Sequence, residues 1–99
     1  MTDEPTVKDN ADAHRFELRV GDDVAFLLYR KPTSGPIVLI HTEVPASLEG
    51  RGVGGRLVKA AMEAARAAGR TVVARCPFVR SYLERHKEYA DLVEPTLPA

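Results

Sequence analysis

The chain is short of residues on which several classes of protein depend. It has one cysteine and so cannot form an internal disulfide, which favours a reducing, cytoplasmic setting. Its three histidines are widely scattered and no C-x-x-C or H-x-x-x-H pair exists, which argues against a metal site. No apolar run approaches the roughly 18–20 residues of a membrane span, and the polar N-terminus does not resemble a signal peptide.

Aromatic residues and net charge are also scarce. Six aromatic residues, none of them tryptophan, offer little for a base-stacking surface, so we expect no nucleic-acid partner. The formal net charge is zero, with 14 lysines and arginines against 14 aspartates and glutamates. These charges are unevenly spread, however. Between residues 50 and 85 eight basic residues face only two glutamates, which favours an anionic ligand.

Ninety-nine residues are enough for one domain with a modest core. Residues 1–12 mix Asp, Asn, Pro and Thr without periodicity, which predicts a disordered N-terminal tail. We expect residues 13–93 to form the domain and residues 94–99 to form a C-terminal tail that contains proline.

Apolar periodicity predicts a mixed α/β (α+β) domain. Strands are expected at residues 15–20 and 24–30, joined as a hairpin, and a β-branched central strand at residues 37–44. A helix is expected at residues 53–68, followed by a strand at 71–75 that makes a right-handed parallel crossover. Pro77 begins a second helix that ends near residue 86, and a helical turn follows at 88–92. The prediction is therefore a sheet of about four strands, three antiparallel and one parallel, with two main helices.

The apolar positions of the first helix share one predicted face, and Gly69 is well placed to end it. That face comprises Val53, Leu57, Ala60, Ala61, Ala64, Ala65 and Ala68.

A glycine-rich loop joins the central strand to this helix, and it reads Glu49-Gly50-Arg51-Gly52-Val53-Gly54-Gly55-Arg56. Glycines leave the backbone bare, so several N–H groups can point at one ligand near the positive end of the helix dipole. Arg51 and Arg56 add two positive charges, and phosphate is the ligand that suits such a loop. A tight turn with close helix packing is the alternative for the glycines, and solvated surface charge is the alternative for the arginines.

This order of elements, with Glu49-x-x-Gly52-x-Gly54 at the loop, resembles the GNAT superfamily of acyl-CoA-dependent N-acetyltransferases. The family's loop pattern is Gln or Arg, two residues, Gly, one residue, then Gly or Ala. Short GNAT-like proteins of the YjdJ type are similar over about residues 16–93, in phrases that here read His41-Thr42-Glu43-Val44-Pro45, Gly52-Val53-Gly54 and Cys76-Pro77-Phe78, with Tyr82 following.

The resemblance implies a GNAT-like fold that takes acetyl-CoA as its co-substrate and moves the acetyl group to an unidentified amine. It implies that the loop's backbone amides hold the pyrophosphate of coenzyme A, with Arg51, Gly52, Val53, Gly54, Gly55 and Arg56 as the contributing residues. Val44 matches the strand position whose backbone bonds the thioester carbonyl. Tyr82 matches the tyrosine that protonates the leaving thiolate, with a packing role as its alternative.

Three further side chains are candidates for the chemistry. His41 and Glu43 share one face of a strand by their spacing, and either could deprotonate an ammonium substrate or line a solvated edge. Cys76 ends the fourth strand, where its thiol could take the acyl group first or serve as a small buried apolar residue.

Two other interpretations stay open. The chain has Glu49 where the family has Gln or Arg, and it lacks the N-terminal helical segment with which longer relatives shape the acceptor site. The missing acceptor-site segment motivates a CoA-binding or interaction module without turnover. A protein that binds a nucleotide or another phosphate ligand with the same loop is the second alternative. The acceptor and the oligomeric state are not specified by the sequence.

Overall fold

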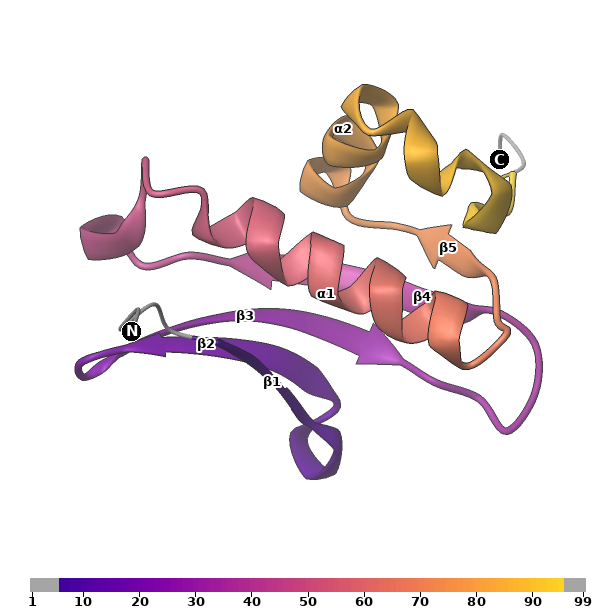
Figure 1. Ribbon diagram of the computed structural model, residues 1–99. Coiled ribbons are helices and arrows are strands. Elements are labelled where there is room, and N and C mark those ends of the chain that lie inside the picture. The colour runs from indigo at the N-terminus through magenta and orange to yellow at the C-terminus, as the bar shows by residue number, and fades with distance from the viewer. Residues whose placement is uncertain (1–5, 96–99) are drawn as a thin grey trace.

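The computed structural model describes residues 6–95 and contains one five-stranded sheet with its α-helices on one face (Figure 1). The strands lie in chain order across the sheet: β1 (Val7–Asn10), β2 (Arg15–Val20), β3 (Asp23–Arg30), β4 (Ile37–Glu43) and β5 (Val72–Ala74). The first four pair antiparallel, and β4 pairs parallel with β5. The helices are α1 (Val53–Ala67) and α2 (Pro77–Arg85), with single 3₁₀ segments η1 (Ala11–Ala13), η2 (Ala46–Leu48) and η3 (Lys87–Leu92). The predicted mixed fold is confirmed, with one strand added.

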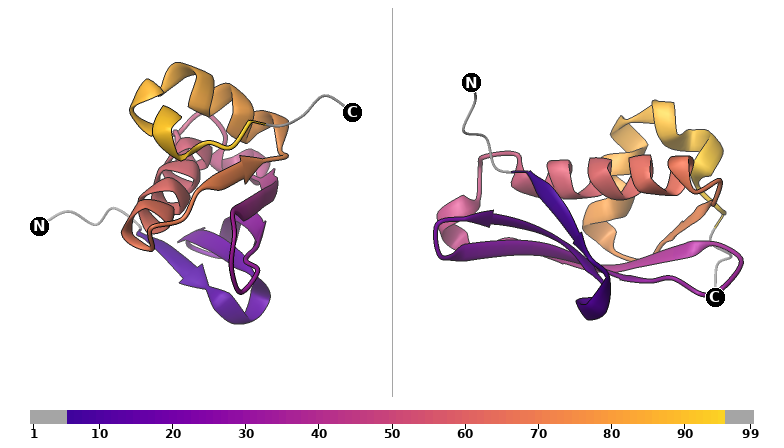
Figure 2. Two further views of the ribbon diagram at one scale, coloured as in Figure 1. Left: turned by 90° about the vertical axis from the view of Figure 1, so that its right-hand side faces the viewer. Right: turned by 60° about the horizontal axis from the view of Figure 1, so that its bottom comes forward.

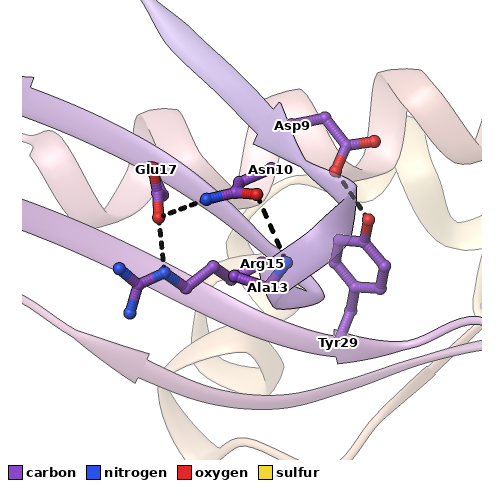
Figure 3. Close-up of polar contacts among 6 residues, drawn as sticks. All are labelled: Asp9, Asn10, Ala13, Arg15, Glu17 and Tyr29. Atoms are coloured by element: carbon purple, nitrogen blue, oxygen red, sulfur yellow. Dashed lines mark hydrogen bonds and ion pairs between the residues drawn. The ribbon is translucent and has the colours of Figure 1, made fainter.

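The added strand, β1, lies inside the segment predicted to be disordered, and for Val7–Asn10 that prediction was wrong. β1 pairs antiparallel with β2, and two side-chain contacts fasten it (Figure 3). The Tyr29 hydroxyl donates to Asp9 at 2.6 Å, and the Asn10 amide donates to Glu17 at 3.1 Å. A four-residue polar strand has no periodicity of its own, because its order comes from partners elsewhere in the chain. The rest of the predicted tail, residues 1–5, lies outside the described residues.

The predicted C-terminal tail also begins with an ordered contact. The Glu94 N–H donates to the Val72 carbonyl at 2.8 Å, and the Thr71 hydroxyl donates to the Glu94 carboxylate at 2.6 Å. These bonds tie the end of the domain to β5. Residues 96–99 lie outside the described part of the chain.

Helix α1 packs its apolar face on the sheet, against core residues such as Leu18, Leu27 and Leu39. The buried positions of this helix are Val53, Gly54, Leu57, Val58, Ala61, Met62 and Ala65. The predicted face was therefore wrong at Ala64 and Ala68, which are exposed, because Val58 and Met62 turn the helix toward their own larger side chains. The helix ends before Gly69, whose φ of +67° is the left-handed conformation expected of a glycine after a helix.

A β-bulge in β4 decides which side chains face the helices. Leu28 pairs with His41 but Tyr29 pairs with Leu39, so Ile40 is an extra residue without a partner on β3. The bulge shifts the alternation of the strand by one residue. Leu39 and Thr42 consequently face the helices, whereas His41 and Glu43 face the opposite side of the sheet. Pairing between β4 and β5 stops at Leu39, just before the bulge.

Candidate functional site

A cleft of about 410 Å³ opens where the pairing of β4 with β5 ends. The end of β4, the glycine-rich loop, the first turn of α1 and the start of α2 enclose it. Its lining residues are Thr42, Val44, Leu48, Glu49, Gly50, Gly52, Val53, Gly54, Gly55 and Phe78. The structure thus brings together Val44 and the loop residues from Gly52 to Gly55, all of which the sequence singled out.

The loop presents its backbone to this cleft. Gly50 and Gly52 have φ of +80° and +72°, the left-handed region in which a β-carbon is strained, and a β-carbon at either position would meet nothing within 4 Å. Gly52 is the N-cap of α1, and the first hydrogen bond back into the helix runs from the Arg56 N–H to the Gly52 carbonyl. The N–H groups of Val53, Gly54 and Gly55 precede that bond, as the first donors of any helix do. The positive end of the dipole of α1 therefore opens on the cleft.

The other two glycines serve the packing of α2 on α1. A β-carbon at Gly54 would lie 2.6 Å from the end of the Phe78 ring, and one at Gly55 would lie 3.1 Å from the Tyr82 ring. Both distances are too short for ordinary contact. The two interpretations of the glycines therefore apply to different positions: Gly50 and Gly52 make the turn and leave space above it, while Gly54 and Gly55 admit the two aromatic rings of α2.

The two predicted arginines lie at the same end of α1 but not on the wall of the cleft. Arg51 is exposed in the loop, and Arg56 is half-buried in the first turn of the helix. Neither is among the lining residues. Their contact with phosphate stays a prediction.

Cys76 lies beside the cleft, as the N-cap of α2. Its sulfur is buried and is 3.5 Å from the hydroxyl of Thr42, a lining residue that the sequence did not single out. Burial raises the pKa of the Cys76 thiol, but hydrogen bonds from Thr42 and from the backbone N–H groups of Val79 and Phe78 lower it. The resulting pKa of the thiol lies below its usual value. The start of α2 therefore favours the thiolate.

Tyr82 is buried one turn further along α2. Its ring stacks on His86, with 3.9 Å between the ring centroids and 16° between the ring planes. Burial raises the pKa of the Tyr82 phenol, and the nearby Glu88 carboxylate adds to the effect. The phenol is therefore protonated at neutral pH and can donate. Tyr82 stands behind Gly55 and does not itself line the cleft.

His41 and Glu43 share one face of β4, but it is the face turned away from Thr42 and Cys76. Both are exposed, and the His41 ring contacts Phe26 with 6.4 Å between centroids. The structure thus separates these two candidates from Cys76 and Tyr82 by the thickness of the sheet. They meet the cleft only at the end of β4, where Glu43 precedes Val44.

Residues 6–95 contain neither a metal-binding cluster nor a membrane-spanning helix. No group of three or more His, Cys, Asp or Glu side chains there could hold a metal ion. None of the helices in that part of the chain has the length and apolar character needed to cross a membrane.

Several residues of the cleft wall were given no role by the sequence analysis, among them Thr42, Leu48 and Phe78. Leu48 is buried in η2, and Phe78 lies across Gly54 with 42% of its surface exposed. Thr42 appeared only within the phrase from His41 to Pro45 that resembles the family, with no role of its own, and the apolar pattern of β4 does not show which side of the sheet it faces.

Comparison with known proteins agrees with this geometry. The family profile described as GCN5-related N-acetyl-transferase matches residues 15–92. An NMR solution structure of a candidate GCN5-like N-acetyltransferase from Staphylococcus aureus superposes with a TM-score of 0.74 and 28% sequence identity, over 97% of this chain and 94% of that chain. The predicted superfamily is confirmed, while the YjdJ-type subgroup stays a prediction. The chain belongs to the GCN5-related N-acetyltransferase family, and its class of activity is acyl transfer.

Proposed function

We propose that the protein transfers an acetyl group from acetyl-CoA to an amine, in a cytoplasmic setting. The observation that carries the proposal is the cleft at the end of β4, which combines an open glycine loop at a helix N-terminus with Thr42 and Cys76 at its side. Membership of the family supports the same chemistry.

The donor is held mainly by backbone. We assign the N–H groups of Val53, Gly54 and Gly55 to the pyrophosphate of coenzyme A, because they open on the cleft ahead of the first intrahelical bond. Arg51 and Arg56 lie at the same helix end and contribute positive potential. Apolar lining from Leu48 and Phe78 suits the uncharged arm that links the phosphates to the thioester.

In direct transfer, the neutral amine attacks the thioester carbonyl, a C–N bond forms and the C–S bond breaks. The backbone of Val44 bonds the carbonyl oxygen as negative charge develops there. The departing thiolate takes the proton of the Tyr82 phenol, which burial keeps protonated and whose ring lies against Gly55 behind the cleft wall. The proton that the ammonium must lose first passes to Glu43, at the point where β4 reaches the cleft, with His41 further back on the same outer face as the alternative acceptor.

A covalent route uses Cys76. Its thiolate attacks the thioester, the acetyl group moves to Sγ, and the thiolate of coenzyme A leaves; the amine then attacks the acetyl-cysteine. The Thr42 hydroxyl and the N-terminus of α2 stabilise this thiolate without a neighbouring base. Mass spectrometry of the protein mixed with acetyl-CoA alone separates the routes, since only the covalent one adds an acetyl mass that hydroxylamine removes and Cys76→Ala prevents.

Binding is tested with a matched pair of glycine variants. Gly52 and Gly35 both have positive φ and open space around them, but only Gly52 lines the cleft. Acetyl-CoA at about 100 times its dissociation constant adds about 2.7 kcal/mol, which raises Tm by several degrees. Gly52→Ala should lose that rise and Gly35→Ala should keep it, although both lose similar stability from strain.

Turnover is measured as release of thiol from acetyl-CoA in the presence of a panel of amines. Release that depends on the amine supports the proposal. Tight binding of acetyl-CoA with no release on any amine would favour a non-catalytic CoA-binding module, and stabilisation by ATP but not by coenzyme A would favour a nucleotide-binding protein.

A further inference from the structure

Within residues 6–95, one face of the sheet has no helix on it. Helices α1 and α2 lie on the same side of the strands, and the views of Figure 2 show the sheet curling around α1 with its outer side open. Burial follows this arrangement: Leu18, Ala25 and Leu27 are fully buried toward α1, whereas their neighbours in the strands are half-buried or exposed. We call the side turned away from α1 the outer face.

Apolar side chains form a band across the outer face. By the strand register, Phe26 and Leu28 of β3, Val38 of β4 and Val73 of β5 project to this side, and each is only half-buried. Ile40, the extra residue of the bulge, is 44% exposed at the rim of the band. Apolar surface collected in this way, over three strands and with no covering element in the described part of the chain, is typical of an interaction surface.

Positive charge borders the band. Among the described strand residues, the outer face carries four cations, Lys8, Arg15, Arg19 and Arg30, against the two carboxylates Glu17 and Glu43. A hollow of about 250 Å³ between the first two strands is lined by Thr6, Lys8, Glu17 and Arg19. An apolar band edged by excess cations is complementary to a polypeptide that alternates apolar and acidic side chains.

One of the two carboxylates is already neutralised within the protein (Figure 3). Glu17 accepts hydrogen bonds from Arg15 Nε at 2.5 Å and from the Asn10 amide at 3.1 Å. The Arg15 guanidinium also lies over the Phe26 ring, 4.5 Å from its centroid. Only Nε of this guanidinium bonds another described residue, so its terminal nitrogens are held in place, next to the apolar band, for an acidic partner.

The outer face leads directly to the cleft. Successive residues of β4 alternate between the two sides: Thr42 lines the cleft, Glu43 faces outward, and Val44 lines the cleft again. A chain bound on the outer face therefore reaches the cleft by passing the end of β4. Glu43, the outward carboxylate nearest that point, can attract and deprotonate an arriving ammonium group.

We propose that the outer face docks the acceptor, and that this acceptor is a polypeptide segment in which apolar and acidic residues flank the amine that receives the acetyl group. This inference rests on the proposed acetyl transfer. The chemistry of the outer face, which lies beside the cleft, identifies the class of acceptor.

The test uses two synthetic peptides with a single central lysine. In one, leucine alternates with glutamate around the lysine; in the other, arginine replaces every glutamate. Lysine amide serves as the small acceptor. We expect KM for the glutamate peptide to be at least tenfold lower than for the arginine peptide, with similar kcat.

The variant Arg19→Glu with Arg30→Glu should raise KM for the glutamate peptide about tenfold and leave turnover of lysine amide unchanged. Lys59→Glu with Lys87→Glu makes the same change of charge at exposed positions on α1 and η3, and should leave KM unchanged. Equal KM values for the two peptides, or the same effect from both double variants, would overturn the proposal.

Failure of the inference and failure of the proposed function give different results. Amide chemical shifts of Phe26, Leu28 and His41, followed on adding the glutamate peptide, report docking without turnover. Shifts at these amides with no acetylation of any amine would sink acetyl transfer but keep the docking surface. If the same amides shift with protein concentration alone, and sedimentation shows a dimer, the outer face joins two copies and does not dock an acceptor.

Discussion

Gly54 offers a direct test of how the cleft is built, because one ring explains why glycine is there. A β-carbon at this position would lie 2.6 Å and 2.9 Å from two atoms of the Phe78 ring. In the wild-type background Gly54→Ala therefore forces the ring aside. Because the displaced atoms are the end of a side chain that is 42% exposed, the cost lies at the low end for overpacking, about 1 kcal/mol. Alanine in a helix also gains up to about 1 kcal/mol over glycine. The two terms nearly cancel, so we expect Gly54→Ala to change the free energy of unfolding by less than about 1 kcal/mol.

The same substitution should be clearly stabilising once the ring is gone. In a Phe78→Ala background nothing opposes the new methyl group, so the helix gain of up to about 1 kcal/mol remains. The coupling between the two positions is then about 1 kcal/mol, above the few tenths expected of independent sites. Urea unfolding of the wild type, both single variants and the double variant measures it. Additive effects would refute the argument, because they would mean that the ring does not require the glycine.

Three further predictions concern the chemistry. Coenzyme A affinity should fall as salt rises, and less steeply for Arg56→Ala, since exposed charges are screened over about 8 Å at physiological ionic strength; equal slopes would remove Arg56 from the site. Because the pKa of Cys76 is lowered, its alkylation by iodoacetamide should reach half its maximal rate at a lower pH than an unperturbed thiol, and Thr42→Val should raise that midpoint; a midpoint unmoved by Thr42→Val contradicts the role of the hydroxyl. Tyr82→Phe should lower kcat by about 10²–10⁴-fold with acetyl-CoA affinity kept, as for loss of a general acid; unchanged kcat leaves Tyr82 a packing residue.

The elements with strong local signals could be predicted from the sequence. Alternation marks β2 and β3, and a turn of glycine and aspartates separates them; β4 is β-branched and ends before Pro45. β1 carries no such signal, since its four residues are mostly polar. What orders it is the open edge of β2 and the bond from Tyr29, which lies 20 residues away from Asp9 in the sequence. A pattern of neighbouring residues carries no information about a contact between residues this far apart in the sequence.

The site divides in the same way. The glycine loop is recognisable because turn chemistry is local, and its position between strand and helix is fixed by the neighbouring patterns. Thr42 is not recognisable, because a bulge at Ile40 moves it from one side of the sheet to the other. Its contact with Cys76 spans 34 residues. Strict alternation would have put His41 and Glu43 beside the thiol instead, so a single extra residue decides which side chains can share the cleft.

The bulge and the start of α2 together explain why a domain of this size has a cleft at all. β5 leaves β4 after Leu39, and Cys76 then begins α2 while Gly54 and Gly55 let its rings approach α1. The N-termini of both α-helices consequently open on the same region, one beside the predicted phosphate site and the other beside the thiol. Anionic groups are favoured at both ends, as transfer from a thioester of a phosphorylated carrier requires. Any substitution that separates α2 from α1 should therefore weaken donor binding and raise the pKa of Cys76 together, even where it touches neither group.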